Sequence, residues 1–272
     1  MMLSWNFPIT RRIFKRYGET EMLKEQRRQE ITELLYQKGY VEITELSQKY
    51  NVAEMTIRRD IDYLIEHNSS FSRKRGGAIF QADSSYEKRI MENPLVKQQI
   101  AAQAFSIIQP AEIVFLDSGT TNLQLAKLIS KRSNNVVVTN SIENAYELLK
   151  NPDVKTFLIG GDLDCNVHST RGIVSEEQMR SIQVDTAFLG ANAIGEDGRV
   201  CISNTIEIGF KKAVLSSSRR SYVLADSSKF GKQALLSYAN AADLDGVITD
   251  RKINPQFLAS MRQKGINIII SE

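Results

Sequence analysis

The stretch Ile113-Val-Phe-Leu-Asp-Ser-Gly-Thr-Thr121 indicates how most of the chain folds. Its first four residues are apolar and favour a buried β-strand, and a helical pattern follows it. The five residues Asp117-Ser-Gly-Thr-Thr121 are small and polar, so the strand passes into the helix through a tight loop. A strand followed closely by a helix is the beginning of a βαβ unit, which predicts a parallel sheet.

The same alternation continues to the end of the chain. Apolar, β-prone runs predict seven strands, at 112–116, 135–139, 155–159, 184–189, 221–225, 244–249 and 266–270. Helical spacing fills most of the gaps, at 122–130, 142–149, 206–216 and 255–264. Such alternation is typical of a mostly parallel sheet with helices on both faces. We therefore expect a doubly wound α/β domain over residues 97–272.

The composition excludes several classes of protein. At roughly 150 residues per domain, a chain of 272 residues indicates about two domains. Its 42% apolar and 25% charged residues fit neither collagen, global disorder nor a disulfide scaffold. We find no apolar run long enough for a membrane span and no secretion signal. The two cysteines, Cys165 and Cys201, suit a reducing cytoplasm, so we expect a cytoplasmic protein without a metal or cofactor.

The first third of the chain carries the whole positive net charge. Residues 1–80 contain 14 Lys and Arg against 11 Asp and Glu, whereas residues 81–272 contain 21 of each. The basic residues cluster as Arg58-Arg59 and as Arg73-Lys74-Arg75. Clustered basic side chains are typical of a surface that binds nucleic acid.

The spacing of apolar residues predicts three short helices before residue 68. Ile31, Leu34 and Leu35 form the stripe of a first helix that Gly39 ends, and a second helix is expected at 45–49. Asn51 tolerates the left-handed conformation of a tight turn, and a third helix is expected at 54–66. Residues 71–80 then predict a basic hairpin with its turn near Gly76-Gly77. These parts indicate a winged helix-turn-helix.

The third helix is the candidate DNA reader. Ile57, Ile61 and Leu64 share its apolar side, which leaves the other faces for the major groove. The candidate DNA-binding residues are Glu54, Met55, Thr56, Arg58 and Arg59 on this helix, with Arg73, Lys74 and Arg75 of the hairpin on phosphates. The alternative, a solvated basic helix in a structural domain, does not explain the order of the parts.

The loop Asp117–Thr121 is a candidate anion site. Its small residues let backbone N–H groups converge on an anion, and the helix N-terminus adds a favourable dipole. The alternative is an ordinary tight turn. Other strand ends contribute Asn140, Asn192, Asp226 and Lys229 to the same edge of the sheet, which favours a pocket.

Several side chains have candidate roles in that pocket. Lys229 or Arg171 could pair with a phosphate, and Asp117 or Asn192 could bind sugar hydroxyls. Glu207 and Lys211 lie four residues apart on a helix, where a simple surface ion pair is as good an explanation as a ligand site.

The first unit resembles the helix-turn-helix of the DeoR family of bacterial transcriptional repressors. The resemblance rests on Arg27-x3-Ile31-x3-Leu35 and on Ala53-Glu-Met-Thr-Ile-Arg-Arg-Asp-Ile61. The second unit resembles the effector domain of the same family along nearly its whole length. The matching strings are Phe115–Thr121, Val137–Ser141, Ile159–Gly161, Phe188–Ala191 and Ala225–Gly231.

The resemblance implies a fold similar to ribose-5-phosphate isomerase and a sensor of phosphorylated sugars. It implies these pocket residues: Asp117, Ser118, Gly119, Thr120, Thr121, Glu207, Lys211, Asp226 and Lys229. It also implies that residues 1–21 are an N-terminal extension, whether a basic arm, a segment upstream of the true start or a tail without a role. Residues 22–80 would then be the DNA-binding domain and 81–96 a linker.

The combined hypothesis is a repressor of a carbohydrate-utilisation operon that a phosphorylated sugar releases from operator DNA. The expected form is a homo-oligomer, a dimer or tetramer, because helix-turn-helix proteins read paired half-sites. A sugar-phosphate isomerase is the alternative, with Glu207, Asp226 and Lys229 as its acid–base groups, but no acid–base constellation is spelled out. An activator is a further alternative, because the sign of regulation depends on operator position.

Overall fold

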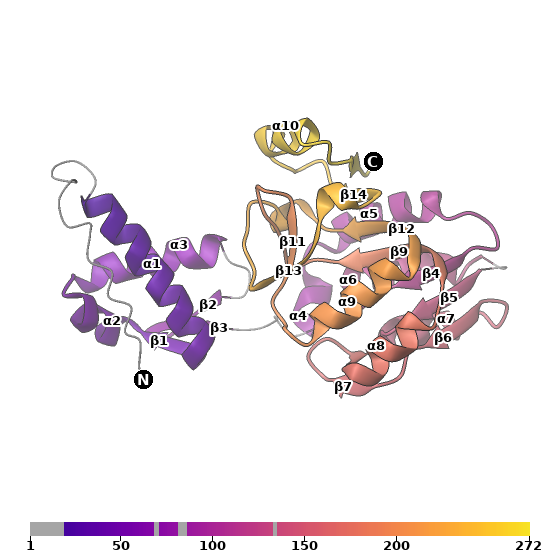
Figure 1. Ribbon diagram of the computed structural model, residues 1–272, viewed down its shortest axis with the longest axis horizontal. Coiled ribbons are helices and arrows are strands. Elements are labelled where there is room, and N and C mark those ends of the chain that lie inside the picture. The colour runs from indigo at the N-terminus through magenta and orange to yellow at the C-terminus, as the bar shows by residue number, and fades with distance from the viewer. Residues whose placement is uncertain (1–18, 68–70, 81–85, 133–134) are drawn as a thin grey trace, which may run out of the picture. The chain divides into compact units, whose positions relative to one another are not determined.

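The computed structural model describes residues 19–67, 71–80, 86–132 and 135–272 (Figure 1). The chain divides into two compact units: residues up to Leu64 with Arg73–Phe80, and Ile65–Ser72 with Gln81–Glu272. Most of the N-terminal extension expected at 1–21 lies outside the described residues. None of the helices in the described ranges combines the length and the apolar character needed to cross a membrane.

The first unit is a winged helix-turn-helix, as predicted. Its elements are α1 (Glu19–Lys38), β1 (Tyr40–Glu42), α2 (Ile43–Tyr50), α3 (Glu54–His67), β2 (Phe71–Lys74) and β3 (Gly77–Phe80). The three strands form one sheet in the order β1-β3-β2. The sequence predicted the hairpin β2–β3 but missed β1, which has only three residues and pairs antiparallel with β3.

The local signals for this unit are confirmed at the level of residues. Asn51 adopts the left-handed conformation, with φ of 51°, and its N–H donates to carbonyls at the end of α2. Gly39 has φ of 73° directly after α1. Ile31, Leu35, Ile57, Ile61 and Leu64 are buried together in the core, whereas Leu34 is only partly buried. The helical spacing therefore identified the core correctly.

The second unit is built on a seven-stranded parallel sheet in the order β15-β14-β12-β9-β4-β5-β6. Its strands are β4 (Ile113–Leu116), β5 (Val136–Thr139), β6 (Lys155–Leu158), β9 (Val184–Gly190), β12 (Ser218–Leu224), β14 (Gly246–Thr249) and β15 (Ile268–Ile270). All seven predicted strands are present, with boundaries that differ by up to three residues at one end.

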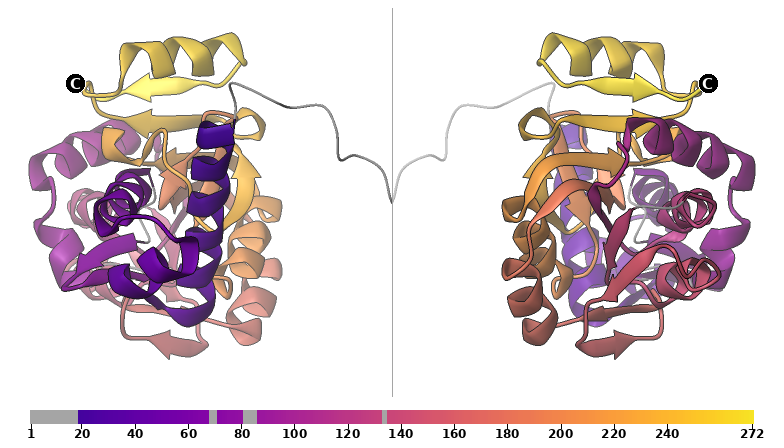
Figure 2. Two further views of the ribbon diagram at one scale, coloured as in Figure 1. Left: turned by 90° about the vertical axis from the view of Figure 1, so that its left-hand side faces the viewer. Right: turned by 90° about the vertical axis from the view of Figure 1, so that its right-hand side faces the viewer.

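Helices cover both faces of this sheet (Figure 2). One layer holds α5 (Pro94–Ile107), α6 (Thr120–Ile129) and α7 (Ile142–Leu148), and the other holds α8 (Ile173–Arg180), α9 (Glu207–Ser216) and α10 (Pro255–Gln263). Successive residues of β4 point to opposite cores: Val114 and Leu116 pack with α5 and α6, and Phe115 packs with α9. This burial on both faces explains why the strands read as continuous apolar runs.

Smaller elements complete the unit. They are α4 (Tyr86–Met91), the hairpin β7 (Asp162–Asp164) and β8 (Ser169–Arg171), the antiparallel sheet of β10 (Ala193–Ile194), β11 (Arg199–Ile202) and β13 (Leu236–Asn240), and the short 3-10 helices η1 (Ser227–Lys229) and η2 (Ala241–Asp243). The sequence indicated a linker with some helix over 81–93, where α4 lies, and did not predict the others. Most of these strands have two to four residues, too few for a clear alternating pattern.

The strand order reverses beside β4. From β4 the chain proceeds to β5 and β6 on one side, and later to β9, β12, β14 and β15 on the other. The strands β4 and β9 are neighbours, and the chain continues from them towards opposite edges of the sheet. In open α/β sheets such a switch point is where ligands bind.

Candidate functional site

The exposed side of α3 carries the predicted DNA-reading residues. Glu54, Met55, Arg58 and Arg59 are exposed and Thr56 is partly exposed, whereas Ile57 is buried against the core. Glu54 and Arg58 form an ion pair one turn apart, with their side chains about half exposed. Surface pairs of this kind are weak, so Arg58 remains able to contact DNA.

Asp60 holds α1 against α3. Its carboxylate is almost fully buried and accepts hydrogen bonds from Arg27 Nε at 2.6 Å and from Arg28 Nε at 2.9 Å. Arg28 also stacks over the ring of Tyr63, 3.6 Å from its centre. The sequence analysis assigned no role to Asp60. Its position directly after Arg58 and Arg59 was the one sequence feature that could have indicated an ion pair. The clamp sets the orientation of the helix that presents Arg58 and Arg59.

The three basic residues of the wing lie in different surroundings. Arg73 forms an ion pair with Asp62 of α3, and both side chains of this pair are exposed. Lys74 lies over the ring of Tyr40, at 5.3 Å from its centre, and Arg75 is exposed. Exposed ion pairs are weak, so Arg73 remains able to contact a phosphate, as do the exposed Lys74 and Arg75.

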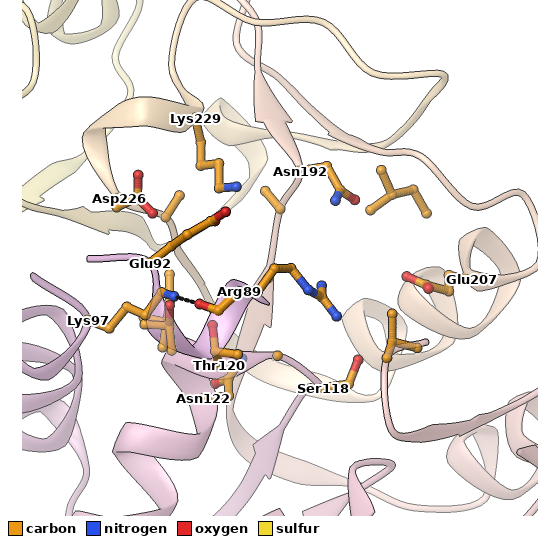
Figure 3. Close-up of a pocket in the computed structure, with 18 of the residues that line it drawn as sticks. Arg89, Glu92, Lys97, Ser118, Thr120, Asn122, Asn192, Glu207, Asp226 and Lys229 are labelled. Carbon is orange, nitrogen blue, oxygen red and sulfur yellow. Dashed lines mark hydrogen bonds between the residues drawn. The ribbon is translucent and has the colours of Figure 1, made fainter. Parts of the chain in front are cut away.

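A polar pocket lies at the switch point of the large sheet (Figure 3). Its walls come from the residues after β4, β9 and β12, from α9 and from the segment around α4 and α5. Nine of the predicted residues line it: Ser118, Gly119, Thr120, Thr121, Asn192, Glu207, Lys211, Asp226 and Lys229. The fold thus brings together residues that are far apart in the sequence, such as Ser118 and Asn192, which are separated by 74 positions.

The loop after β4 presents the start of α6 to this pocket. Gly119 precedes α6 with φ of 124°, a conformation that only glycine adopts easily. Thr120 begins the helix, so its first N–H groups and hydroxyls lie at the pocket wall. This arrangement can accept an anion.

Asp117 lies beneath the pocket and organises its floor. Its carboxylate accepts the N–H of Ser118 at 2.9 Å and that of Gly190 at 2.8 Å, and it pairs with the ammonium of Lys211. Asp117 and Lys211 are both buried, and Lys211 also lies near the ring of Tyr238. This pair is buried rather than the surface pair of Glu207 and Lys211 that the helical spacing offered as an explanation.

Tyr238 completes the floor. Its hydroxyl donates to the carbonyl of Gly190 at 3.0 Å. Burial, and secondarily the nearby charge of Asp117, raises the pKa of this phenol well above 10. The hydroxyl therefore remains a hydrogen-bond donor at neutral pH and holds the loop after β9 in place.

Asn140 and Arg171 lie outside the residues that line the pocket. The side chain of Asn140 donates to the carbonyl of Thr170 at 3.3 Å, which links the end of β5 to β8. Arg171 pairs with Asp164 across the hairpin β7–β8. Asn140 and Arg171 were predicted to line the pocket because they lie near strand ends. The hairpin β7–β8 instead provides both side chains with partners of their own.

Four polar side chains that line the pocket were not predicted from the sequence. Arg89, Glu92 and Lys97 come from the segment that we interpreted as a linker or as the start of the domain, and Asn122 comes from the first turn of α6. Asn122 is buried, and its Oδ1 has no hydrogen-bond partner within the described part of the chain. A buried acceptor without a partner is costly, so it suits a donor on a ligand.

Lys97 is the most unusual of these residues. It is 5% exposed, and its ammonium donates to the carbonyl of Arg89 at the end of α4. Burial lowers the pKa of Lys97, Asp226 and Glu92 raise it, and the cations Lys229 and Arg89 lower it further. Cationic side chains therefore lie next to carboxylates at this end of the pocket.

The pocket can hold an anion beside several hydroxyl-binding groups. Positive side chains and a helix N-terminus are next to carboxylates and amides, a combination suited to a small polar ligand. Among the described residues no cluster of His, Cys, Asp or Glu has the arrangement to hold a metal ion.

A winged helix-turn-helix joined to an α/β domain with a ligand pocket defines the class of one-component transcriptional regulators. Two family models match the chain, the DeoR-like helix-turn-helix domain at residues 27–83 and the DeoR C-terminal sensor domain at residues 92–251. The chain belongs to the DeoR family of transcriptional regulators.

Relatives with similar sequences support this assignment. "Putative aga operon transcriptional repressor" of Escherichia coli O157:H7 is 31% identical over 251 residues, which cover 90% of this chain and 93% of that protein. "Transcriptional repressor AccR" of Agrobacterium fabrum is 30% identical, with 75% of this chain and 81% of that protein covered. Regulator IolR of Bacillus subtilis is 29% identical, with 81% and 89% covered. These relatives are named as transcriptional regulators, which agrees with the expectation that the chain is not an enzyme.

Solved structures with a similar backbone include ribose-5-phosphate isomerase A from Methanocaldococcus jannaschii. It is 16% identical, has a TM-score of 0.38 and covers 51% of this chain and 55% of that one. Translation initiation factor eIF-2B from Pyrococcus horikoshii is 14% identical, with a TM-score of 0.40 and 84% of this chain covered, and 80% of that one.

Proposed function

We propose that this DeoR-family regulator represses a carbohydrate-utilisation operon and that a phosphorylated sugar, bound in the α/β pocket, releases it from operator DNA. The observation that carries the proposal is the pocket itself. It places an anion-binding helix start, cationic side chains and hydroxyl-binding groups together at the switch point of the sheet.

The phosphate end of the ligand would bind the loop Ser118–Thr121. Backbone N–H groups at a helix start bind phosphate well, and Lys229 supplies a full positive charge on the same pocket. The turn that carries Lys229 is firmly held, because Asp226 accepts the N–H of Ser228 at 2.9 Å and Ser227 donates to Asp250 at 2.6 Å. The backbone position from which Lys229 extends is therefore set before a ligand binds.

The sugar end would bind the carboxylates and amides. Glu207 and Asp226 accept hydrogen bonds from hydroxyls, and the unpartnered Oδ1 of Asn122 offers a further buried acceptor. A ligand with both an anion and several hydroxyls uses all of these groups. An inorganic anion or an unphosphorylated sugar uses only part of them.

Operator recognition would use Thr56, Arg58 and Arg59 on α3 with Arg75 on the wing. Arginine binds the major-groove edge of guanine through two hydrogen bonds, and wing cations contact phosphates. The repressing sign follows relatives that are named repressors, such as the Agrobacterium fabrum protein.

Self-association would provide the two DNA-binding units that paired half-sites require. The edge strand β6 exposes Phe157 and Leu158, at 47% and 49%, and Tyr146 and Leu149 are exposed on or directly after α7. An exposed apolar edge strand is a surface that pairs with another strand. A second copy of this chain, joined edge to edge at β6, would cover it and form a dimer.

A thermal-shift screen tests the ligand. The full chain is heated with a panel of pentose and hexose phosphates and with the same sugars without phosphate. A ligand at about 100 times its dissociation constant stabilises the native state by about 2.7 kcal/mol, which raises the melting temperature by roughly 5–10 °C. We expect a rise with a phosphorylated sugar and a smaller rise in Lys229→Ala.

The matched control is Lys212→Ala, which removes an exposed lysine from α9 without touching the pocket. It should respond as the wild type does. A shift with a bare sugar or a non-sugar, and with no sugar phosphate, would refute the proposed ligand class.

A further inference from the structure

We propose that α4, the helix between the DNA-binding wing and the sensor domain, forms one wall of the effector site, and that Arg89 and Lys97 bind the anionic group of the ligand and so tie α4 to occupancy of the pocket. This inference rests on the proposed function, because it assigns the regulatory connection of the same pocket.

The position of α4 carries the argument. Arg89 on α4, Glu92 directly after it and Lys97 on α5 line the same pocket as Ser118 and Lys229. Figure 3 shows the guanidinium of Arg89 extending into the pocket, in the space between Ser118, Asn192 and Glu207. A ligand that fills this space must therefore meet a side chain of α4.

Lys97 connects the pocket to the backbone of α4. Its buried ammonium donates to the carbonyl of Arg89, in the last turn of the helix. An ammonium has three donors, so Lys97 can hold this carbonyl and an anionic ligand at once. The same group is thus both an anchor for α4 and a part of the pocket wall.

Two further contacts connect α4 to the rest of the second unit. Tyr86 stacks on His168 with ring centres 4.5 Å apart, and Arg89 donates to the carbonyl of Asn166 at 3.4 Å. Both contacts are made to the β7–β8 hairpin and its loop. A six-residue helix is too short to be stable by itself, so its order depends on such contacts and on any that a ligand adds.

Both cations and carboxylates surround Lys97. Burial lowers its pKa most, Asp226 and Glu92 raise it, and Lys229 and Arg89 lower it, so each of these two cations lies close enough to repel the Lys97 ammonium. An anionic group between them would remove this repulsion and bring α4 and η1 together on one ligand.

The chain connection makes α4 relevant to DNA binding. Residues 81–85 are all that separate β3 of the wing from α4, so their extended length is at most roughly 20 Å. Fixing or releasing α4 therefore changes the point from which the DNA-binding unit is tethered. In a dimer, the two DNA-binding units must match the spacing of two half-sites, so binding is sensitive to where each unit is tethered.

Hydrogen–deuterium exchange of the full chain tests the inference, with inorganic phosphate as the probe and chloride at the same ionic strength as the reference. We expect phosphate to slow exchange both in peptides covering 118–123 and in peptides covering 86–97. Slowed exchange at 118–123 reports anion binding by the loop, and slowed exchange at 86–97 reports the coupling of α4.

The variants are Arg89→Ala and Arg89→Gln, with Lys88→Ala as a control of equal charge on the same helix. The loss of Arg89 should weaken phosphate binding about tenfold or more, as expected for a hydrogen bond to a charged group. At saturating phosphate the loop should still be protected while 86–97 is not. Lys88→Ala should behave as the wild type does.

The outcomes separate the two proposals. Protection of 118–123 without any change at 86–97 in the wild type would overturn the role of α4 and leave the proposed function standing. Unchanged phosphate affinity in both Arg89 variants would do the same. Protection of neither segment would show that the pocket does not bind phosphate, and both proposals would fall.

Discussion

At the scale of single residues, the buried pair of Asp117 and Lys211 supports the whole pocket floor. Removing one member leaves the other buried without a partner, which typically costs about 3–5 kcal/mol. We expect Asp117→Ala to lower the free energy of unfolding by this amount in urea titrations. The double variant Asp117→Asn with Lys211→Met should recover part of the loss, because no buried charge remains.

The neighbouring Lys212 provides the control for this pair, since it is exposed on the same helix. Lys212→Met should change the unfolding free energy by less than about 0.5 kcal/mol. The result would contradict the account of the pocket floor if the double variant lost as much unfolding free energy as Asp117→Asn and Lys211→Met lose separately, added together.

Lys97 gives the pocket a predicted pH dependence. Burial, with Arg89 and Lys229, lowers its pKa below the usual 10.5, so in the free protein it loses its proton at a lower pH than an exposed lysine does. An anionic ligand prefers the ammonium form, and binding therefore takes up a proton in that range. Affinity should fall as the pH rises into the alkaline range below 10.5, where Lys97 loses its proton.

Calorimetric titrations in buffers of different ionisation enthalpy measure this proton uptake. Lys97→Met should bind more weakly and should lose this alkaline pH dependence. A dependence that survives in this variant would show that another group titrates.

At the scale of elements, we propose that α3 contacts the bases of the operator and that the wing contacts its phosphates. Arg59 is exposed on the reading helix, and Arg75 is exposed on the wing. Arg59→Ala should cost about 1–3 kcal/mol on the operator and relax its sequence preference. Arg75→Ala should weaken all DNA binding uniformly and reduce the salt slope by about one.

Fluorescence anisotropy on an operator chosen by in vitro selection measures both quantities. Arg73→Ala is the comparison, since its ion pair with Asp62 is exposed and weak and its loss should reduce the salt slope by a similar amount. A variant of Arg59 that discriminates operator from random DNA as well as the wild type would contradict its assignment as a base reader.

The elements also show what the sequence could and could not predict. The long, periodic segments were predictable: three helices with buried Ile57 and Ile61, and seven strands buried on both faces. The role of α4 was not, because six residues with polar neighbours look like a linker until tertiary contacts order them. Asn140 and Arg171 were placed in the pocket by their strand ends, but a hairpin inserted after β6 gives them other partners.

At the scale of the whole molecule, the proposed dimer depends on the edge strand β6. Phe157→Asp places a charge on the exposed edge and should shift the protein towards monomer in analytical ultracentrifugation. Leu235→Asp, at another exposed apolar position, should leave the association unchanged. An unchanged oligomer in Phe157→Asp would exclude this edge as the interface.

The central claim joins the two units in one function, and operator release tests it most directly. The full chain is bound to its selected operator, and each sugar of the panel is titrated in with and without its phosphate. We expect at least one phosphorylated sugar to weaken operator binding tenfold or more, while its unphosphorylated form has no effect. Operator binding that no phosphorylated sugar changes, or that a bare sugar relieves equally well, would contradict the account.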